Sequence, residues 1–445
     1  MADQLLSGWG RATWSAAHIE RPASTDEAVE VAGSGVSFIA RGLGRSYGDQ
    51  ATNAGATVVD MTDLNSPVPA PDETGRIVVP AGLSIDELLH RIVPWGWFVP
   101  VTPGTRHVTI GGAIAADVHG KNHHRDGTFC EHLDEVVLAL PDGSTVRCSP
   151  DEDAALFWAT AGGLGLTGII VEATIRLHAI ETSRIVVDTT RFDTLDALLD
   201  AMVEADRTAP SSVAWIDLVT AAGRRSVLTT GRFAGVDDLP KRQQASPLSY
   251  APRPRLAAPR WVPNGLLRHS TVRAFNEAWF RAAPKQRQGQ LQSIARYYHP
   301  LDGVTGWNRI YGPQGFVQWQ MVVPDGAEDT LRHCVDALAD APTPCFLAVL
   351  KRFGPANPGP LSFPLQGWTL AADMPAMSPG LAVLLDQLDQ RVAEAGGRIY
   401  LAKDARLDPE MVPIMYPRLD EWRAVRRRVD PEGLLRSDMA RRLGL

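Results

Sequence analysis

Residues 111–124, with the sequence GGAIAADVHGKNHH, most constrain what this chain can fold into. Two adjacent glycines and small residues through Ala116 let the backbone approach a flat ligand, and imidazole, amide and ammonium groups follow directly. Buried ionisable groups cost free energy unless they are paired or used. The segment therefore indicates either a binding site or a solvated polar loop with three histidines.

The overall composition excludes several classes of protein. A length of 445 residues predicts two or three domains. A formal charge of −7 argues against nucleic acid as the main partner, because phosphate binding needs a basic surface. The four cysteines show no metal-like or disulfide-like grouping, so we expect no metal site.

The chain also carries no obvious membrane or export signal. Its N-terminus lacks a basic stretch followed by an apolar one, and no run of about eighteen apolar residues appears. We expect a cytoplasmic protein whose only membrane contact is peripheral, at the plasma membrane, although the periplasmic side stays open.

A glycine-rich turn follows the first strand-like segment, within SFIARGLGRSYGD at residues 37–49. Its spacing differs from that of a dinucleotide-binding fingerprint, and no apolar-periodic helix follows it. The turn instead predicts a nest of backbone N–H groups around a phosphate, with Arg41 or Arg45 adding charge or support. A turn without a ligand is the alternative.

The order of elements indicates an α+β fold. Strand-like segments at 57–61 and 76–84 precede a helix that a capping box of Ser84 and Glu87 should begin and that should end before Pro94. After residue 184, six strand-like segments alternate with helical ones near 194–206, 270–282, 327–340 and 380–395. This series predicts an antiparallel sheet with helices on one face and a pocket on the other.

Several motifs occur in one order along the chain: ARGLGRSYGD, PGTR, GGAIA, DVHGKNHH, GGLGLTGII, YYHP, WNRIYGP, YLAKDAR and SDMARRL. Together they resemble the decaprenylphosphoryl-ribose 2′-oxidase family, within the vanillyl-alcohol-oxidase (PCMH) type of FAD-binding protein. The resemblance runs from residue 9 to the C-terminus. It implies an FAD-binding domain at 1–183, a substrate-binding domain at 184–397, and a segment at 398–445 that returns to the FAD domain.

The resemblance also implies an activity. Members of this family are flavin subunits of an actinobacterial epimerase, and they oxidise the C2′ hydroxyl of decaprenylphosphoryl-β-D-ribofuranose to a 2′-keto intermediate. A separate NADH- or NADPH-dependent keto-reductase then forms decaprenylphosphoryl-arabinose for the arabinogalactan and lipoarabinomannan of the cell wall. Two alternatives are an alditol or sugar-lactone oxidase acting on a soluble polyol, and a flavin-binding scaffold without catalysis.

The same resemblance assigns expected roles to individual residues. Many relatives bond the flavin covalently through a histidine in the first glycine-rich turn, but Tyr47 stands near that place, so we expect noncovalent FAD and a catalytic-centre role for Tyr47. Alcohol oxidation needs a proton acceptor and a positive charge beside the reduced flavin. We expect His119 to accept or relay the hydroxyl proton and Lys403 to supply the charge.

The remaining expected site residues fall into two groups. The cofactor-binding group comprises Arg41, Gly42, Leu43, Gly44, Arg45, Ser46, Tyr47, Gly48, Gly104, Thr105, Thr109, Gly111, Gly112, Ala116, Asp117, His119, Gly120, Asn122, His123, Gly165, Ile170, Tyr400, Ala402 and Lys403, with Lys121 as a support. The substrate-binding group comprises Trp215, Tyr298, Asn308, Gln318, Gln320 and Lys351. Gln318 and Gln320 are two apart on one strand, so their side chains share a face.

Three further features complete the expectations. Thr369 and Ala371 replace an Asn and a Cys of mycobacterial members, which alters a pocket wall. The proline-rich segment 235–267 predicts a lid whose Leu256, Trp261, Val262, Leu266 and Leu267 are exposed and touch a prenyl chain or a membrane, or else an incidental insertion. The basic run at Arg423, Arg426, Arg427 and Arg428 predicts a solvated helix face rather than a phosphate site.

Overall fold

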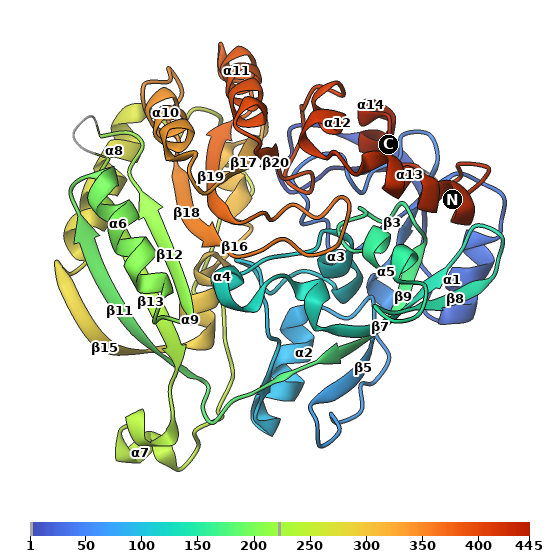
Figure 1. The fold of residues 1–445 in the computed structure, drawn as a ribbon, viewed down its shortest axis with the longest axis horizontal. Coiled ribbons are helices and arrows are strands. Elements are labelled where there is room, and N and C mark those ends of the chain that lie inside the picture. Colours follow the sequence, from blue (N-terminus) through green and yellow to red (C-terminus); the bar gives the residue numbers. More distant parts are fainter. Residues whose placement is uncertain (1–2, 221–223) are drawn as a thin grey trace.

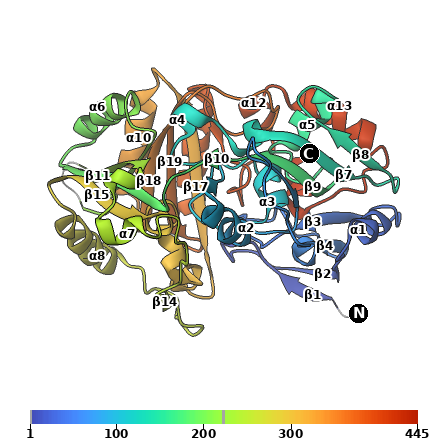
Figure 2. The same cartoon turned by 90° about the horizontal axis from the view of Figure 1, so that it is seen from below.

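The N-terminal part of the chain forms two four-stranded sheets that lie side by side (Figure 2). The structure is a computed structural model and describes residues 3–220 and 224–445. The first sheet has the order β1 (Gln4–Leu6), β2 (Ser15–Glu20), β4 (Thr57–Asp60), β3 (Phe38–Arg41), with β2, β4 and β3 parallel. The second is antiparallel, with the order β5 (Arg76–Pro80), β9 (Ile169–Arg176), β7 (Leu133–Ala139), β8 (Thr145–Cys148).

Short helices connect and cover these sheets. They are α1 (Thr25–Ala32), α2 (Ile85–Ile92), α3 (Ile110–Ala115), α4 (His123–Asp126) and α5 (Ala154–Thr160). The predicted capping box is confirmed, because Ser84 Oγ accepts from the Glu87 N–H and the Glu87 carboxylate accepts from the Ser84 N–H. Helix α2 then buries Leu88, Leu89 and Ile92 and ends before Pro94, as predicted.

An eight-stranded antiparallel sheet dominates the rest of the molecule (Figure 1). Its order is β15 (Gln286–Ser293), β11 (Arg184–Phe192), β13 (Ser226–Phe233), β12 (Ser211–Ile216), β18 (Leu347–Phe353), β19 (Gly367–Pro375), β17 (Phe316–Pro324), β20 (Arg398–Ile399). All six predicted strands are present, and the α+β fold class is confirmed. Strand β15 was not predicted, because its sequence QRQGQLQS has almost no apolar residue to alternate.

The two faces of this sheet have different partners. Helices α6 (Leu195–Asp206), α10 (Glu328–Ala339) and α11 (Leu381–Glu394) bury one face, against residues such as Met321, Leu350 and Leu370. Helix α8 (His269–Ala282) lies across the sheet from α6 (Figure 2), where the Phe280 carbonyl accepts from Arg191. The prediction that all four helices share one face is therefore wrong for α8, whose polar contacts attach it to the edge of the other face.

The C-terminal segment returns to the N-terminal sheets. It contains α12 (Met411–Met415), α13 (Leu419–Val429) and α14 (Asp438–Leu443), and both chain ends lie at the same end of the molecule (Figure 1). Leu435 forms a parallel bridge with Phe38, and the Trp422 indole donates to the Ala159 carbonyl. In the basic run, Arg428 pairs with Asp153 at the surface, whereas Arg426 is mostly buried and donates to the Leu435 carbonyl.

The proline-rich segment 235–267 is anchored to the large domain. It contains α7 (Lys241–Gln244) and β14 (Leu256–Ala257), and β14 pairs with β16 (Val304–Thr305). Leu256, Trp261 and Leu266 are exposed as predicted, but Val262 is buried and Leu267 is partly buried, because Asn264 accepts from the Gln314 N–H and draws this stretch inward. Within the described ranges, no helix is long and apolar enough to cross a membrane.

Candidate active site

The glycine-rich loop 42–48 follows directly after β3. Gly44 has a φ of +62°, and a Cβ at Gly42 would lie 2.1 Å from Thr109 Oγ1, so the loop packs closely on the start of α3. Across the described residues, no hydrogen bond leaves the N–H groups of Leu43, Gly44, Arg45 and Ser46. Four successive free donors around a left-handed glycine are the pattern of a backbone nest, which suits an anion such as a phosphate.

The two arginines of this loop differ in role. Arg41 donates to the carbonyls of Ala51 and Ser7, at 3.0 and 2.8 Å, so it holds the loop in shape. Arg45 stacks its guanidinium 3.9 Å from the centroid of the Trp9 ring, and its buried Nε has no partner in the described part of the chain. Arg45 is therefore the cation that can meet a phosphate here.

Most polar side chains of residues 117–124 bind other parts of the protein. Lys121 donates to the Tyr297 carbonyl, His123 Nδ1 accepts from the Gly354 N–H at 3.1 Å, and His124 Nε2 donates to the Ala209 carbonyl at 3.0 Å. These contacts tie the segment to the large sheet and its flanks. His119, Asn122 and His123 are buried, so the solvated-loop alternative is excluded.

Asp117 fixes the same segment from the other side. Its carboxylate accepts from the side chains of Asn357 and Ser362, both at 2.6 Å, and from the Cys130 N–H. Its backbone has a φ of +38°, an uncommon conformation outside glycine. Asp117 therefore shapes the backbone at 116–119 and has little capacity left for a ligand.

His119 contacts the face of the large sheet that carries the predicted substrate-binding residues. Its Nε2 lies 3.0 Å from the Gln320 amide nitrogen, which donates to it, and its Nδ1 has no partner within the described residues. Burial lowers the pKa of His119 well below its ordinary value, and Lys351, His123 and Lys403 lower it further. The imidazole is thus neutral at pH 7 and can accept a proton.

Four of the six predicted substrate-binding residues share the inner face of the large sheet. In register, Trp215 lies opposite Val349, Val349 opposite Ala371, and Ala371 opposite Gln320. One rung away, Lys351 lies opposite Thr369, whose hydroxyl accepts from Gln320 at 3.2 Å. Gln318 follows on the same face, so Thr369 and Ala371 form part of this wall.

The other two predicted substrate residues lie elsewhere. Tyr298 packs its ring between Phe98 of the N-terminal part and Phe233 of β13, with centroids 5.4 and 6.1 Å away, in a core cluster shared by the two parts. Asn308 donates to the Trp9 carbonyl at 2.9 Å and so supports the chain beside the glycine-rich loop.

Lys403 and Tyr47 meet an acid that was not predicted, Asp373. The Lys403 Nζ lies 3.9 Å from the centroid of the Tyr47 ring, and Gln318 donates to Asp373 Oδ1 at 2.5 Å. Burial lowers the pKa of Lys403 to about 7, an effect that Asp373 opposes and Lys351 strengthens. Burial raises the pKa of Asp373 to about 7, against the hydrogen bond from Gln318 and the charge of Lys403.

Asp373 and Lys403 therefore shift each other's pKa inside a buried site, and each group can be charged or neutral near pH 7. Asp373 was missed because its strand, GWTLAADMP, reads as an apolar strand. The available signal was its period of two from Ala371 and Thr369, which puts its side chain on the pocket face. Burial also lowers the pKa of Lys351 to about 8.

The remaining predicted cofactor residues support this geometry through the backbone. The Ala402 carbonyl accepts from the Tyr47 N–H at 3.3 Å, and the Tyr400 hydroxyl donates to the Ala116 carbonyl at 2.6 Å. A Cβ at Gly48 would lie 2.1 Å from the Asp404 carbonyl. Gly165 has a φ of +77°. Others lie in the facing turns and in α3, namely Gly104, Thr105, Gly111, Gly112 and Gly120. Ile170 lies on β9, where it packs beside Gly111.

Comparisons with known proteins agree with this arrangement. Residues 16–149 match the family described as FAD binding domain, and residues 379–443 match that of D-arabinono-1,4-lactone oxidase. A decaprenylphosphoryl-β-D-ribose oxidase of Mycolicibacterium smegmatis is 42% identical over 99% of this chain and 97% of its own. An uncharacterised protein of Streptomyces coelicolor is 42% identical over 82% of this chain and its whole length.

A more distant similarity covers only a short part of the chain. The human Delta(24)-sterol reductase is 38% identical over 18% of this chain and 16% of its own. The expected FAD-binding fold is confirmed, and FAD is the cofactor. The free N–H groups of the glycine-rich loop and the unpartnered Arg45 Nε fit the pyrophosphate of that cofactor.

Proposed function

The chain belongs to the decaprenylphosphoryl-β-D-ribose oxidase family of FAD-dependent oxidoreductases, and we propose that it oxidises the C2′ hydroxyl of decaprenylphosphoryl-β-D-ribofuranose to the 2′-keto sugar. This is the first half of an epimerisation to decaprenylphosphoryl-arabinose. The observation that carries the proposal is the buried face where His119, Gln318, Gln320 and Lys403 come together. The 42% identity with the Mycolicibacterium smegmatis oxidase over 99% of this chain supports it.

When bound, FAD would supply the oxidising power as the acceptor of a hydride from the substrate alcohol. The loop 42–48 and Arg45 would hold its pyrophosphate, and Tyr47 with the backbone at 111–120 would hold its ring. The segment 41–48 contains no histidine, which supports noncovalent binding.

His119 is the proposed acceptor of the hydroxyl proton. Its neutral imidazole is held in place by the Gln320 amide and lies against the rings of Phe353 and Tyr400, with centroids 4.8 and 5.1 Å away. A substrate hydroxyl that replaces the Gln320 amide at Nε2 would meet a fixed base in a site without bulk water.

Lys403 is the proposed source of positive charge. Its ammonium lies over the Tyr47 ring, and the charge it carries is stabilised by the Asp373 carboxylate. Negative charge that develops beside it during the reaction favours its protonated form and is stabilised in turn. Gln318, Gln320 and Lys351 are proposed to bind the sugar hydroxyls and the phosphodiester.

Two partners follow from this chemistry. The 2′-keto product needs a hydride from a second enzyme to become the arabinose form, so we propose a keto-reductase partner that uses NADH or NADPH. The lipid-linked substrate resides in the plasma membrane, so we propose peripheral contact with that membrane.

The pocket wall also bears on inhibition. Ala371 offers no thiol there, so a cysteine-directed inhibitor would find no target at this position.

The test is anaerobic mixing of the purified holoprotein with a polyprenylphosphoryl ribose, followed at the flavin absorbance near roughly 450 nm. Rapid loss of absorbance, with a free pentitol inert, is expected. Reduction by the pentitol alone would favour a second candidate, a soluble polyol or sugar-lactone oxidase, to which the match at residues 379–443 points. A protein that no prenylphosphoryl sugar reduces would contradict the proposal.

A further inference from the structure

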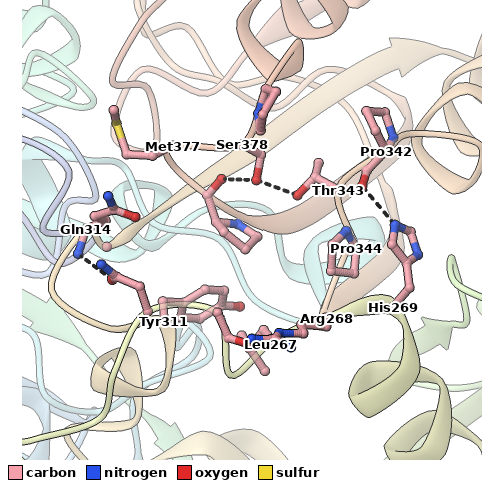
Figure 3. A pocket seen from close by; sticks show the side chains of 15 residues that line it. Leu267, Arg268, His269, Tyr311, Gln314, Pro342, Thr343, Pro344, Met377 and Ser378 are labelled. Carbon is pink, nitrogen blue, oxygen red and sulfur yellow. Dashed lines mark hydrogen bonds between the residues drawn. The ribbon is translucent and has the colours of Figure 1, made fainter.

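A surface cavity of about 380 Å³ lies at the end of the large sheet where β17 begins and β19 ends. Its walls come from residues 264–269, 311–315, 342–344 and 375–379, whose side chains face a common space (Figure 3). This volume falls within the range of roughly 300–1,000 Å³ typical of small-molecule sites. None of the predicted catalytic, cofactor-binding or substrate-binding residues lines the cavity, but Leu267 of the predicted lid does.

One wall residue, Tyr311, connects the cavity with the candidate active site. Its ring stacks on Phe316 at 4.2 Å between centroids, and Phe316 meets the Tyr47 ring at 5.3 Å. Lys403 lies on that same Tyr47 ring. The Tyr311 hydroxyl and Asp373 Oδ2 are both buried without a partner among the described residues.

The same row of aromatic rings continues outward to the surface. Tyr311 meets Phe346 at 6.1 Å, Phe346 meets Phe275 at 5.4 Å, and Phe275 stacks on Trp279 at 6.2 Å. Phe275 and Trp279 are 47% and 52% exposed. A continuous series of ring contacts, which we call the aromatic row, thus extends from Tyr47 through the cavity residue Tyr311 to two rings at the surface.

The cavity lining mixes apolar and polar groups. Four prolines (Pro342, Pro344, Pro375 and Pro379) form its apolar part together with Leu267, Tyr311 and Met377, and the polar part includes Gln314, Thr343 and Ser378. Among the described residues no carboxylate lines the cavity, and Arg268 and His269 are its basic side chains. Met377 is 70% exposed at the rim, so its side chain is free to contact an apolar ligand.

We propose that this cavity and the aromatic row bind the first isoprene units of the substrate's lipid chain. The inference rests on the proposed function, which requires an apolar chain to leave a buried sugar site. The contacts from Tyr47 through Phe316 to Tyr311 bring the cavity close to the candidate sugar site, and a lining without carboxylates among the described residues admits a ligand whose other end is an anionic phosphodiester. Tyr311 then contacts the chain close to where the sugar begins.

The first test measures binding directly and does not depend on catalysis. The FAD-loaded protein is titrated calorimetrically with monomeric geranylgeranyl phosphate. Met377→Asp and, independently, Pro342→Asp are expected to weaken binding roughly tenfold, because each puts a charge against the apolar chain. Val383→Asp on α11, also at an exposed apolar position, is the matched control and should bind like the wild type.

The second test compares substrates that differ only in the lipid. Wild-type kcat/KM should be about tenfold or more higher for the long-chain substrate than for a methyl-capped phosphoribose, and Met377→Asp should remove that difference while leaving the short substrate within twofold. Equal binding of geranylgeranyl phosphate by wild type and both variants would overturn the inference. A second result would also overturn it: the protein binds anionic phospholipid vesicles but not the monomeric probe, and Met377→Asp abolishes the vesicle binding.

These readouts separate the two proposals. If geranylgeranyl phosphate binds and both variants weaken it, the lipid site stands even where no ribose substrate reduces the flavin, and only the proposed reaction is lost. If the ribose substrates reduce the flavin at rates independent of chain length, the reaction stands and the lipid site is wrong.

Discussion

Two short segments of this chain look alike in sequence but handle their polar groups in opposite ways. Among the described residues, the loop 42–48 leaves four successive backbone N–H groups without partners. Lys121, His123 and His124 each make a hydrogen bond to the large sheet or its flanks, and within the described part of the chain only His123 Nε2 and His124 Nδ1 among their polar side-chain atoms stay unpaired. Both segments combine glycine with basic side chains. Composition therefore does not distinguish a ligand site from a seam between two parts of a fold, but an account of hydrogen bonds does.

We call residues 117–124 the seam, because they join the N-terminal part to the large sheet. His119 belongs to the seam, but its side chain faces the predicted substrate-binding residues. The largest expected effect follows. His119→Gln should slow flavin reduction by substrate about 100-fold or more, because a positioned base is lost. His124→Gln, its matched control from the same segment, should lower the melting temperature but leave the reduction rate within twofold. Near-normal reduction by His119→Gln in anaerobic stopped-flow would remove the proposed role.

Asp117 tests the seam itself. Asp117→Asn should lower the free energy of unfolding by about 3 kcal/mol, because an amide presents a donor to Asn357, Ser362 and the Cys130 N–H, which are donors already. Urea denaturation of the cofactor-free protein measures this change. Asp151→Asn at the surface should change it by no more than about 0.5 kcal/mol. Equal stability of both variants would show that the seam contributes little.

Lys121 gives the seam a pH dependence. Burial lowers its pKa from the ordinary 10.5 to about 7, so between these values the unfolded chain binds more protons than the folded one. The free energy of unfolding should then rise with pH, by at most about 1.4 kcal/mol per unit, from pH 7 towards 10.5. The penalty of burying the charge is complete below pH 7.

The measurement is denaturant unfolding at pH 7.5, 8.5 and 9.5 for the wild type and Lys121→Met. The free energy of unfolding of the wild type, taken relative to that of Lys121→Met, should rise across this series. Lys285→Met, at an exposed position, should show no such trend against the wild type. A flat difference for Lys121→Met would mean that this lysine is already solvated in the folded state.

The smallest expected effect concerns the ligand side of the comparison. A Cβ at Gly104 would meet no atom within 4 Å, so Gly104→Ala should leave the cofactor-free stability unchanged. If the turn at Gly104 faces the cofactor, the same variant should weaken FAD binding about tenfold, a cost typical of a close contact. Gly303→Ala has equal free space and should retain FAD like the wild type. Equal FAD retention by both variants would place this turn outside the cofactor site.

Local signals made much of the fold predictable. The capping box at Ser84 and Glu87, the six strands with alternating residues and the shared face of Gln318 and Gln320 depend on neighbours within a few residues. The proximity of Asp373 to Lys403 was not predictable in this way. It requires the register of β17 with β19 and the return of the C-terminal segment, both of which are long-range features.

Exposure in loops was the least predictable property. Val262 reads as an exposed apolar residue in a proline-rich segment, yet its neighbour Asn264 is held by the Gln314 N–H and the stretch turns inward. Tyr298 shows the same limit, because the motif around it does not reveal that its ring packs with Phe98 and Phe233.

The return of the C-terminal segment has a consequence for the order of folding. Phe38 in the first parallel sheet pairs with Leu435, and Ser15 and the Ala54 N–H both bind the Asp438 carboxylate. A ribosome therefore releases almost the whole chain before the N-terminal sheet acquires these last partners. Closure across some 400 residues is slow, because loop entropy must be overcome first. Cofactor capture during synthesis should thus be a late event, and a truncated chain should expose an incomplete, aggregation-prone flavin half.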